Sequence, residues 1–255
     1  MSSLRARCPD CRTLTAVAIG PGYQCHSCGR EFEAGLVRVP RAWGTGGEVM
    51  AEAAALEVAY PETAVVAEDT LEEQNRVLAA ALPERPLVLG GCCCSHVGAV
   101  TGLAGRGGRL GVVWLDAHGD LNTPETSPSG NLWGMPFRML LDGGVVAAGD
   151  VALVGARSLD PGELEFVEEH GIDDSIDRAL DGIDRVYLAL DVDVLDPSEI
   201  DVLIPEPDGL TLEQAEAVVA EVARRMPVAG VGVTGLAGDE RNGEIVRRLL
   251  AAAGL

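Results

Sequence analysis

Length, composition and charge already limit what this chain can do. Its 255 residues are enough for one large α/β domain with a small appendage. Acidic residues outnumber basic ones by 40 to 19, and the net charge of −21 argues against binding to nucleic acid or to an anionic membrane surface. Lysine is absent, which excludes Schiff-base chemistry through a lysine of this chain. We find no apolar segment of the signal-peptide or membrane-spanning kind, and we expect a cytoplasmic protein.

Two Cys-x-x-Cys pairs stand near the start of the chain, Cys8 with Cys11 and Cys25 with Cys28. In a reducing compartment, cysteines at this spacing are more often metal ligands than disulfides. Two such turns supply four thiolates in the tetrahedral arrangement that zinc prefers. A redox role is the alternative, but the surrounding sequence lacks the βαβ pattern of thioredoxin-like proteins. We therefore predict a zinc-ribbon-like knuckle over residues 1–35 that holds one structural zinc.

The pattern becomes that of an α/β domain from about residue 36, and we expect this domain to extend to residue 255. Apolar runs rich in β-branched residues predict buried parallel strands at 64–67, 86–89, 110–115, 151–155, 185–190 and 228–234. Amphipathic segments lie between several of these runs, and helices are predicted to begin after Thr70, Asp160 and Thr211 and near Arg241. This alternation predicts a three-layer αβα fold with a mostly parallel sheet.

Polar motifs directly follow several of the predicted strands. Cys92, Cys93 and Cys94 follow Gly90-Gly91 after one strand, and two further motifs are Asp116-Ala117-His118-Gly119-Asp120 and Asp191-Val192-Asp193. Ligands of open α/β sheets bind at the carboxyl ends of the strands, so we expect these motifs to converge. Alternate residues of an extended chain project to the same side, which aims the Asp and His side chains together. Four carboxylates and one imidazole suit one or two divalent ions such as manganese or zinc.

These motifs resemble those of a known enzyme family. Residues 115–136 (LDAHGDLNTPETSPSGNLWGMP) resemble one signature of the arginase, or ureohydrolase, family, and residues 188–198 (LALDVDVLDPS) resemble its second signature. The Gly-Gly pair at 90–91 is similar to the start of a further family motif. The resemblance covers roughly residues 36–255. It implies an arginase-like fold, a homo-oligomer, and a two-metal site whose bridging hydroxide attacks a guanidinium or amidine carbon.

The resemblance also implies roles for individual residues. Asp116 and Asp191 match the bridging ligands of the family, and His118 and Asp193 match ligands of one metal. Asp120 matches a ligand of the other metal that also orients the hydroxide, which makes it the expected catalytic residue. Three residues match positions that hold the α-amino and α-carboxylate groups of the substrate in arginases: Asn122, Ser129 and Asn131. Hydrogen bonding within the loop is the alternative for these three.

This chain departs from the family pattern at several positions. Cys93 stands where the family usually has a histidine ligand, and a thiolate there would favour zinc, iron or nickel over manganese. Trp133 replaces the histidine that serves as a proton shuttle, and Gly235 replaces the glutamate that pairs with the guanidinium. Ile204 replaces a threonine of the substrate loop. His96 we interpret as a hydrogen-bonded residue rather than a ligand.

The sequence favours a metal-dependent hydrolase of linear C–N bonds, acting on an arginine-like or modified guanidino or amidine compound. Loss of the guanidinium carboxylate makes unmodified arginine doubtful as its substrate. The alternative is a non-catalytic descendant that binds metal and a small ligand and uses the zinc knuckle for interaction. A deacetylase-like site with one metal on Asp116, His118 and Asp191 is a third possibility, but the presence of Asp120 and Asp193 argues against it.

Overall fold

The computed structural model describes residues 5–6, 8, 10–11, 13–19, 22–58, 60–237 and 242–255. The strands of this part of the chain form one sheet in the order β1-β2-β3-β4-β6-β10-β9-β7-β8, and β5 pairs with β4. They are β1 (Arg5–Ala6), β2 (Ala16–Ile19), β3 (Gly22–Cys25), β4 (Glu31–Val39), β5 (Glu62–Val65), β6 (Arg85–Gly90), β7 (Leu110–Leu115), β8 (Val151–Val154), β9 (Arg185–Asp191) and β10 (Val228–Thr234). Pairing is antiparallel from β1 to β4 and parallel everywhere else. The predicted mostly parallel sheet is confirmed.

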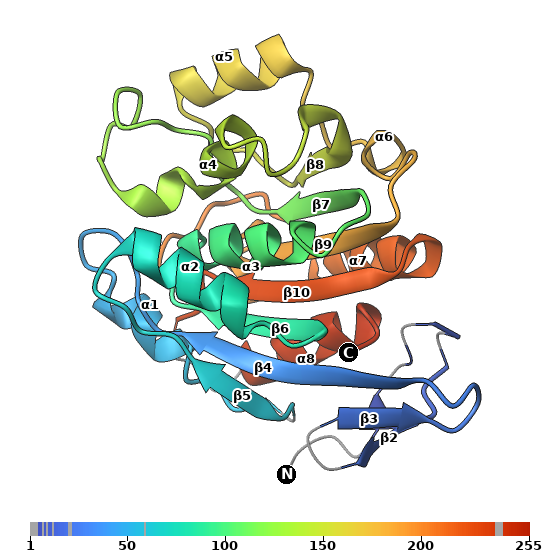
Figure 1. Ribbon diagram of the computed structural model, residues 1–255. Coiled ribbons are helices and arrows are strands. Elements are labelled where there is room, and N and C mark those ends of the chain that lie inside the picture. The colour runs from blue at the N-terminus through green and yellow to red at the C-terminus, as the bar shows by residue number, and fades with distance from the viewer. Residues whose placement is uncertain are drawn as a thin grey trace.

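Helices cover both faces of the parallel sheet (Figure 1). They are α1 (Glu48–Ala53), α2 (Leu71–Ala81), α3 (Cys94–Ala104), α4 (Pro136–Asp142), α5 (Pro161–His170), α6 (Ile176–Ala179), α7 (Leu212–Arg225) and α8 (Asn242–Ala252). Alternate strand residues face opposite layers: Leu87 and Leu89 pack in the cluster that includes α7 and α8, whereas Val88 packs in the cluster that includes α2 and α3. The three-layer αβα architecture is therefore confirmed. Among the described residues no helix has the length and apolar character to cross a membrane.

The predicted helix starts follow from capping side chains. Thr70 accepts a hydrogen bond from the backbone N–H of Glu73 at the start of α2, and both Asp160 and Thr211 form capping boxes at α5 and α7. Gly171 ends α5 with a φ of 62°, which a glycine adopts without strain. The predicted helix start near Arg241 falls outside the described residues, which resume with α8 at Asn242.

Strand β4 joins the N-terminal ribbon to the parallel sheet. Its residues 31–33 pair antiparallel with β3, and its residues 34–39 pair parallel with β6. The division predicted between residues 35 and 36 lies inside this strand. Figure 1 shows β2 and β3 beside the beginning of β4, whereas the carboxyl ends of the parallel strands lie at the opposite edge. The ribbon is thus placed far from the edge that carries the polar motifs.

Candidate metal centre

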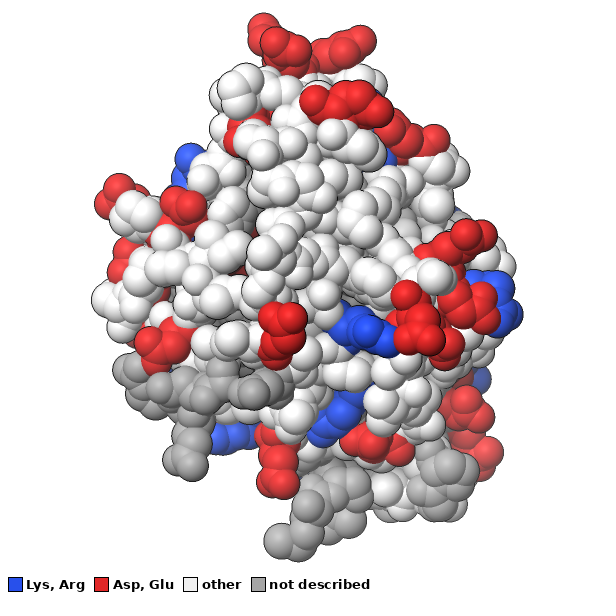
Figure 2. All heavy atoms as spheres, turned by 90° about the vertical axis from the view of Figure 1, so that its left-hand side faces the viewer, with Lys and Arg blue, Asp and Glu red and all other residues white. Residues whose placement is uncertain are grey.

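Several parallel strands end around one cavity of about 170 Å³. Asp116 follows β7, Asp191 is the last residue of β9, and Gly235 follows β10. The lining residues include Cys93, Asp116, His118, Asp120, Asp191 and Asp193. The parallel topology thus brings the polar motifs together, as the sequence led us to expect. On the face at which these strands end, acidic side chains lie mainly around the margin (Figure 2).

The possible ligand atoms form two overlapping groups. One group is Cys93, Asp116 and Asp120, and within it the ligand atoms lie within 4.8 Å of one another. The other is Asp116, His118 and Asp193, which meets the same limit. Asp116 belongs to both groups, so ions held by the two groups would share this carboxylate. Asp191 adjoins the first group, because its Oδ2 lies 2.8 Å from Sγ of Cys93.

The carboxylates of this site are buried and repel one another. Asp116 is 1% exposed, Asp120 is 4% exposed, and Asp191 and Asp193 are each 6% exposed. Burial, together with repulsion between neighbouring carboxylates, raises the pKa of all four groups, that of Asp191 to about 7 and that of Asp193 to about 6. Oδ2 of Asp120 is buried and has no hydrogen-bond partner in the described chain. A pair of divalent cations would satisfy this oxygen and neutralise the cluster, so the residues present fit such a pair.

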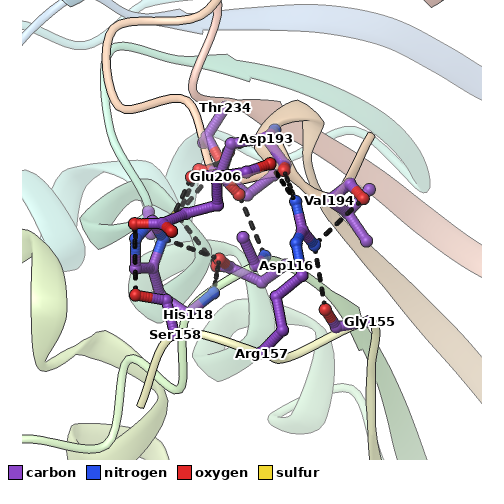
Figure 3. A network of polar contacts seen from close by, with 12 residues as sticks. Asp116, His118, Gly155, Arg157, Ser158, Asp193, Val194, Glu206 and Thr234 are labelled. Atoms are coloured by element: carbon purple, nitrogen blue, oxygen red, sulfur yellow. Dashed lines mark hydrogen bonds and ion pairs between the residues drawn. The ribbon is translucent and has the colours of Figure 1, made fainter. Parts of the chain in front are cut away.

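His118 is oriented from two sides, as Figure 3 shows. Its Nδ1 lies 3.0 Å from Oδ2 of Asp193 and 3.4 Å from Oδ1 of Asp116, so this nitrogen faces the ligand group. Its Nε2 lies 3.5 Å from Oε1 of Glu206, which also accepts a hydrogen bond of 3.1 Å from the hydroxyl of Ser158. Burial lowers the pKa of His118, but the two aspartates outweigh it and raise the pKa to about 12. Glu206 lies on the side of the ring away from the ligand group, and a carboxylate in this position commonly fixes the ring of a metal-binding histidine.

Arg157 fixes the loop that carries Glu206. Its guanidinium donates five hydrogen bonds of 2.8–3.2 Å, all to backbone carbonyl oxygens: those of Gly155, Asp193, Val194, Glu206 and Pro207 (Figure 3). These bonds join the end of β8, the metal motif after β9 and the loop before α7. Neither Arg157 nor Glu206 is among the residues predicted from the sequence. The available signals were an arginine just after a buried strand and a glutamate between two prolines.

Comparison with known proteins places this cavity in a family. A sequence model of the arginase family matches residues 49–251. The chain belongs to the arginase family. It is similar to the arginase of Staphylococcus aureus (strain MRSA252), with 37% identity over 161 residues that make up 51% of this chain and 53% of that protein. The chain thus spans about half the length of the curated relatives it matches.

Solved structures of the arginase family share the fold. The arginase from Bacillus caldovelox superposes with a TM-score of 0.75 at 29% identity, covering 87% of this chain and 98% of that chain. The formimidoylglutamase from Bacillus subtilis superposes with a TM-score of 0.69 at 18% identity, covering 86% of this chain and 85% of that one, a likeness that concerns the fold alone. The predicted arginase-like fold is therefore confirmed.

Cys93 occupies a well-packed position at the start of α3 in this arginase-family site. Its Sγ lies 3.2 Å from the hydroxyl of Thr234, which donates a hydrogen bond of 3.0 Å to Oδ2 of Asp191. The same hydroxyl lies 3.3 Å from Nε2 of His96, whose Nδ1 lies 3.0 Å from the Tyr187 hydroxyl. Complete burial lowers the pKa of His96 to about 3, so this imidazole is neutral. The interpretation of His96 as a hydrogen-bonded residue is confirmed.

The three residues expected to hold substrate groups all make hydrogen bonds within loops. The Asn122 amide donates to Oδ2 of Asp160 at 2.8 Å and accepts from the Thr126 hydroxyl at 2.9 Å. Oγ of Ser129 accepts from the backbone of Asn131 at 3.2 Å, and Oδ1 of Asn131 accepts from the backbone of Thr45 at 3.0 Å. Asn122 and Ser129 also line the cavity, together with Asp160 and Glu163 at the start of α5. Their contact with substrate remains a prediction.

Two residues that we predict to depart from the arginase-family pattern make close contacts in the structure. Trp133 packs so closely on Gly44 and Gly47 that a Cβ at either glycine would meet its ring, and it lines the cavity with Met50 and Ile204. Gly235 has a φ of +78°, and a Cβ there would overlap the carboxylate of Asp191. A glutamate cannot occupy position 235 without displacing this metal-site residue.

Proposed function

We propose that this chain is a metal-dependent hydrolase of linear C–N bonds in guanidino or amidine compounds. The observation that supports it best is the pair of overlapping ligand groups around Asp116, in a cavity where Oδ2 of Asp120 lacks any partner among the described residues. A structural role for four buried carboxylates would leave their repulsion uncompensated, whereas a metal role explains their number and their position at the strand ends.

The residues of the two groups divide the proposed metal binding between them. Cys93, Asp116, Asp120 and Asp191 would hold one divalent ion, and Asp116, His118, Asp191 and Asp193 would hold the other. When bound, such ions lower the pKa of water and polarise the substrate. Asp120 would hold one of these ions and would also orient the attacking water. The thiolate of Cys93 favours zinc, iron or nickel at the ion that it would bind. The three carboxylates and the imidazole proposed for the other ion suit manganese or zinc.

The lining of the cavity indicates the class of substrate. Asp160 and Glu163 line it together with the metal-group carboxylates, so the cavity suits a compound with a cationic group. Met50, Trp133 and Ile204 form an apolar wall that suits a hydrocarbon or substituted end. An indole donates one hydrogen bond but does not titrate near neutrality, so Trp133 cannot relay a proton. We infer a small modified guanidino or amidine substrate rather than unmodified arginine.

Metal-reconstituted protein assayed against a panel of guanidino and amidine compounds tests this proposal. Release of urea or ammonia from at least one compound is expected, and Asp120→Asn should reduce that rate by roughly 10³-fold. Arginine turnover is expected to be weak or absent, and robust urea release from arginine would overturn the inferred specificity. Metal binding without turnover of any compound would instead favour the non-catalytic descendant, which the replacements at Trp133 and Gly235 make the second candidate.

The backbone at Gly235 predicts the result of restoring the missing carboxylate. We expect Gly235→Glu to lower metal occupancy and to give no arginine hydrolysis, because its side chain displaces Asp191 and its φ is strained. Gly46→Ala is the control, since Gly46 also has a positive φ but no atom lies within 4 Å of an added Cβ. Metal content by plasma mass spectrometry measures the effect. Full occupancy with gained arginase activity would contradict it.

Glu206 is predicted to act as a positioning residue for His118. We expect Glu206→Gln to weaken metal binding by about 10- to 100-fold, the usual cost of losing such a carboxylate. Titration against a metal buffer measures the affinity directly, without reliance on turnover. Glu213→Gln on the exposed face of α7 is the matched control and should leave affinity unchanged. Equal affinities of the Glu206 variant and wild type would remove Glu206 from the site.

We also propose a cytoplasmic homo-oligomer. All seven cysteines are free, and the five that we propose as ligands bind metal only when reduced, which fits a reducing compartment. The homo-oligomer is an inference from the family resemblance, and light scattering of the purified protein tests it.

A further inference from the structure

The four cysteines of the ribbon converge on a common centre. Sγ of Cys8 lies 3.6 Å from Sγ of Cys28, and Sγ of Cys11 lies 3.5 Å from Sγ of Cys25. All four sulfur atoms lie within 4.8 Å of one another. A disulfide requires only about 2.05 Å between sulfurs, whereas a tetrahedral zinc with Zn–S bonds of 2.3 Å separates them by about 3.8 Å. The observed spacing matches the metal site and not a disulfide.

Hydroxyl groups lie beside two of these sulfur atoms. The Thr13 hydroxyl lies 3.0 Å from Sγ of Cys11, and the Thr15 hydroxyl lies 3.3 Å from Sγ of Cys25. Hydroxyls in such positions donate hydrogen bonds to thiolates and stabilise them as ligands. Both therefore suit a bound cation.

The ribbon shares its apolar core with the catalytic sheet. Cys8 and Cys25 are 1% exposed and belong to the same buried cluster as Leu36 and Leu87 of the parallel sheet. Within this cluster the ring of Tyr23 stacks on Phe32 of β4, with 5.6 Å between the centroids. An independently folding knuckle on a linker would bury its own core, which is not what these residues do.

Strand β4 connects the ribbon mechanically to the edge of the catalytic site. Its first residues pair with β3, and its last residue, Val39, pairs with Gly90 at the end of β6. The backbone N–H of Gly91 then donates a hydrogen bond of 2.8 Å to the carbonyl of Val39. Gly91 lies two residues before Cys93. One end of β4 therefore pairs with the cysteine-bearing ribbon, and the other end contacts the segment that carries Cys93.

We propose that Cys8, Cys11, Cys25 and Cys28 bind one zinc ion that anchors the start of β4 and thereby stabilises the whole catalytic sheet. The ribbon is thus an integral part of the hydrolase domain and not a separate module. This zinc is distinct from the metals of the cavity, since β2 and β3 lie at the end of the sheet opposite to the carboxyl ends of the parallel strands (Figure 1).

The fluorescence of the tryptophans reports unfolding of the part of the chain that follows β4, and not of the ribbon. Trp43, Trp114 and Trp133 are the three tryptophans of the chain, and all lie after β4. We compare wild type with the double variant Cys11→Ser/Cys28→Ser, which leaves one ligand on each turn. Zinc per chain and thermal unfolding by tryptophan fluorescence are measured on both. The double variant should lose one zinc equivalent, and its tryptophan transition should fall by roughly 5 °C or more.

Two further variants keep this test decisive. Cys28 is exposed, so Cys28→His replaces a ligand without disturbing the core and should retain both the zinc and the melting temperature. Asp116→Asn should lose cavity metal but retain the ribbon zinc. If the double variant does not accumulate as folded protein, zinc content and the tryptophan transition are compared between Cys28→Ser and Cys28→His instead. Unchanged zinc content overturns the site, and zinc loss with a tryptophan transition within about 1 °C of wild type overturns its role in the sheet.

Discussion

Replacing Asp116 with asparagine is expected to remove both cavity metals and to reduce C–N bond hydrolysis by about 10³-fold or more. Asp116 belongs to both ligand groups, so its loss affects both ions at once. The substitution preserves shape, and the Trp114 indole, which donates to Oδ2 at 3.0 Å, can still find an oxygen there. The fold should therefore survive, because repulsion within the carboxylate cluster also decreases.

Metal content and unfolding temperature separate the two effects of this substitution. Asp177→Asn is the matched control, because Asp177 is 88% exposed and pairs only with Arg225 in the described structure. That variant should keep its metal and its activity. Retention of either cavity ion by Asp116→Asn would show that the groups do not share this ligand. Loss of the metals with activity intact would overturn the proposed function.

Replacing Cys93 with alanine is expected to deplete one of the two cavity metals and to abolish hydrolysis. Cys93 is 5% exposed, and its sulfur lies within 4.8 Å of ligand atoms of Asp116 and Asp120. X-ray absorption at the zinc edge should show a Zn–S bond near 2.3 Å from the cavity in wild type, beside that of the ribbon. Cys93→His should keep two metals and shift preference toward manganese, because an imidazole is harder than a thiolate.

The neighbouring cysteines provide controls for Cys93. Cys92 and Cys94 pack in a small apolar cluster with Met50, so alanine at either position should cost packing energy and leave the metal content unchanged. If Cys93→Ala retains both ions, the thiolate is not a ligand, and the proposed ligand set with Cys93 on one ion is wrong. Retention of a single ion on the His118 side, with activity, would point to a one-metal mechanism.

Much of the fold follows from local sequence. Buried parallel strands are continuous apolar runs, and for this reason the strands β6, β7, β9 and β10 were predicted within one or two residues. Capping side chains act within one helical turn, which made the starts of α2, α5 and α7 predictable. The division of the chain at residue 35 is a different matter. Strand β4 changes partners part-way along, and a strand's partner is not encoded in its own residues.

The sequence by itself determined the donors of the candidate metal centre, because Asp-x-His-x-Asp and Asp-x-Asp carry their chemistry in adjacent residues and parallel strands must end at one edge. Tertiary structure alone decided how these donors are held. Arg157 meets the loop of Glu206 across 49 and 50 residues, Trp133 packs on Gly44 and Gly47, and Gly235 lies against Asp191. Each of these contacts joins segments that are remote in sequence. Their partners are therefore chosen by burial and loop geometry, which no local pattern records.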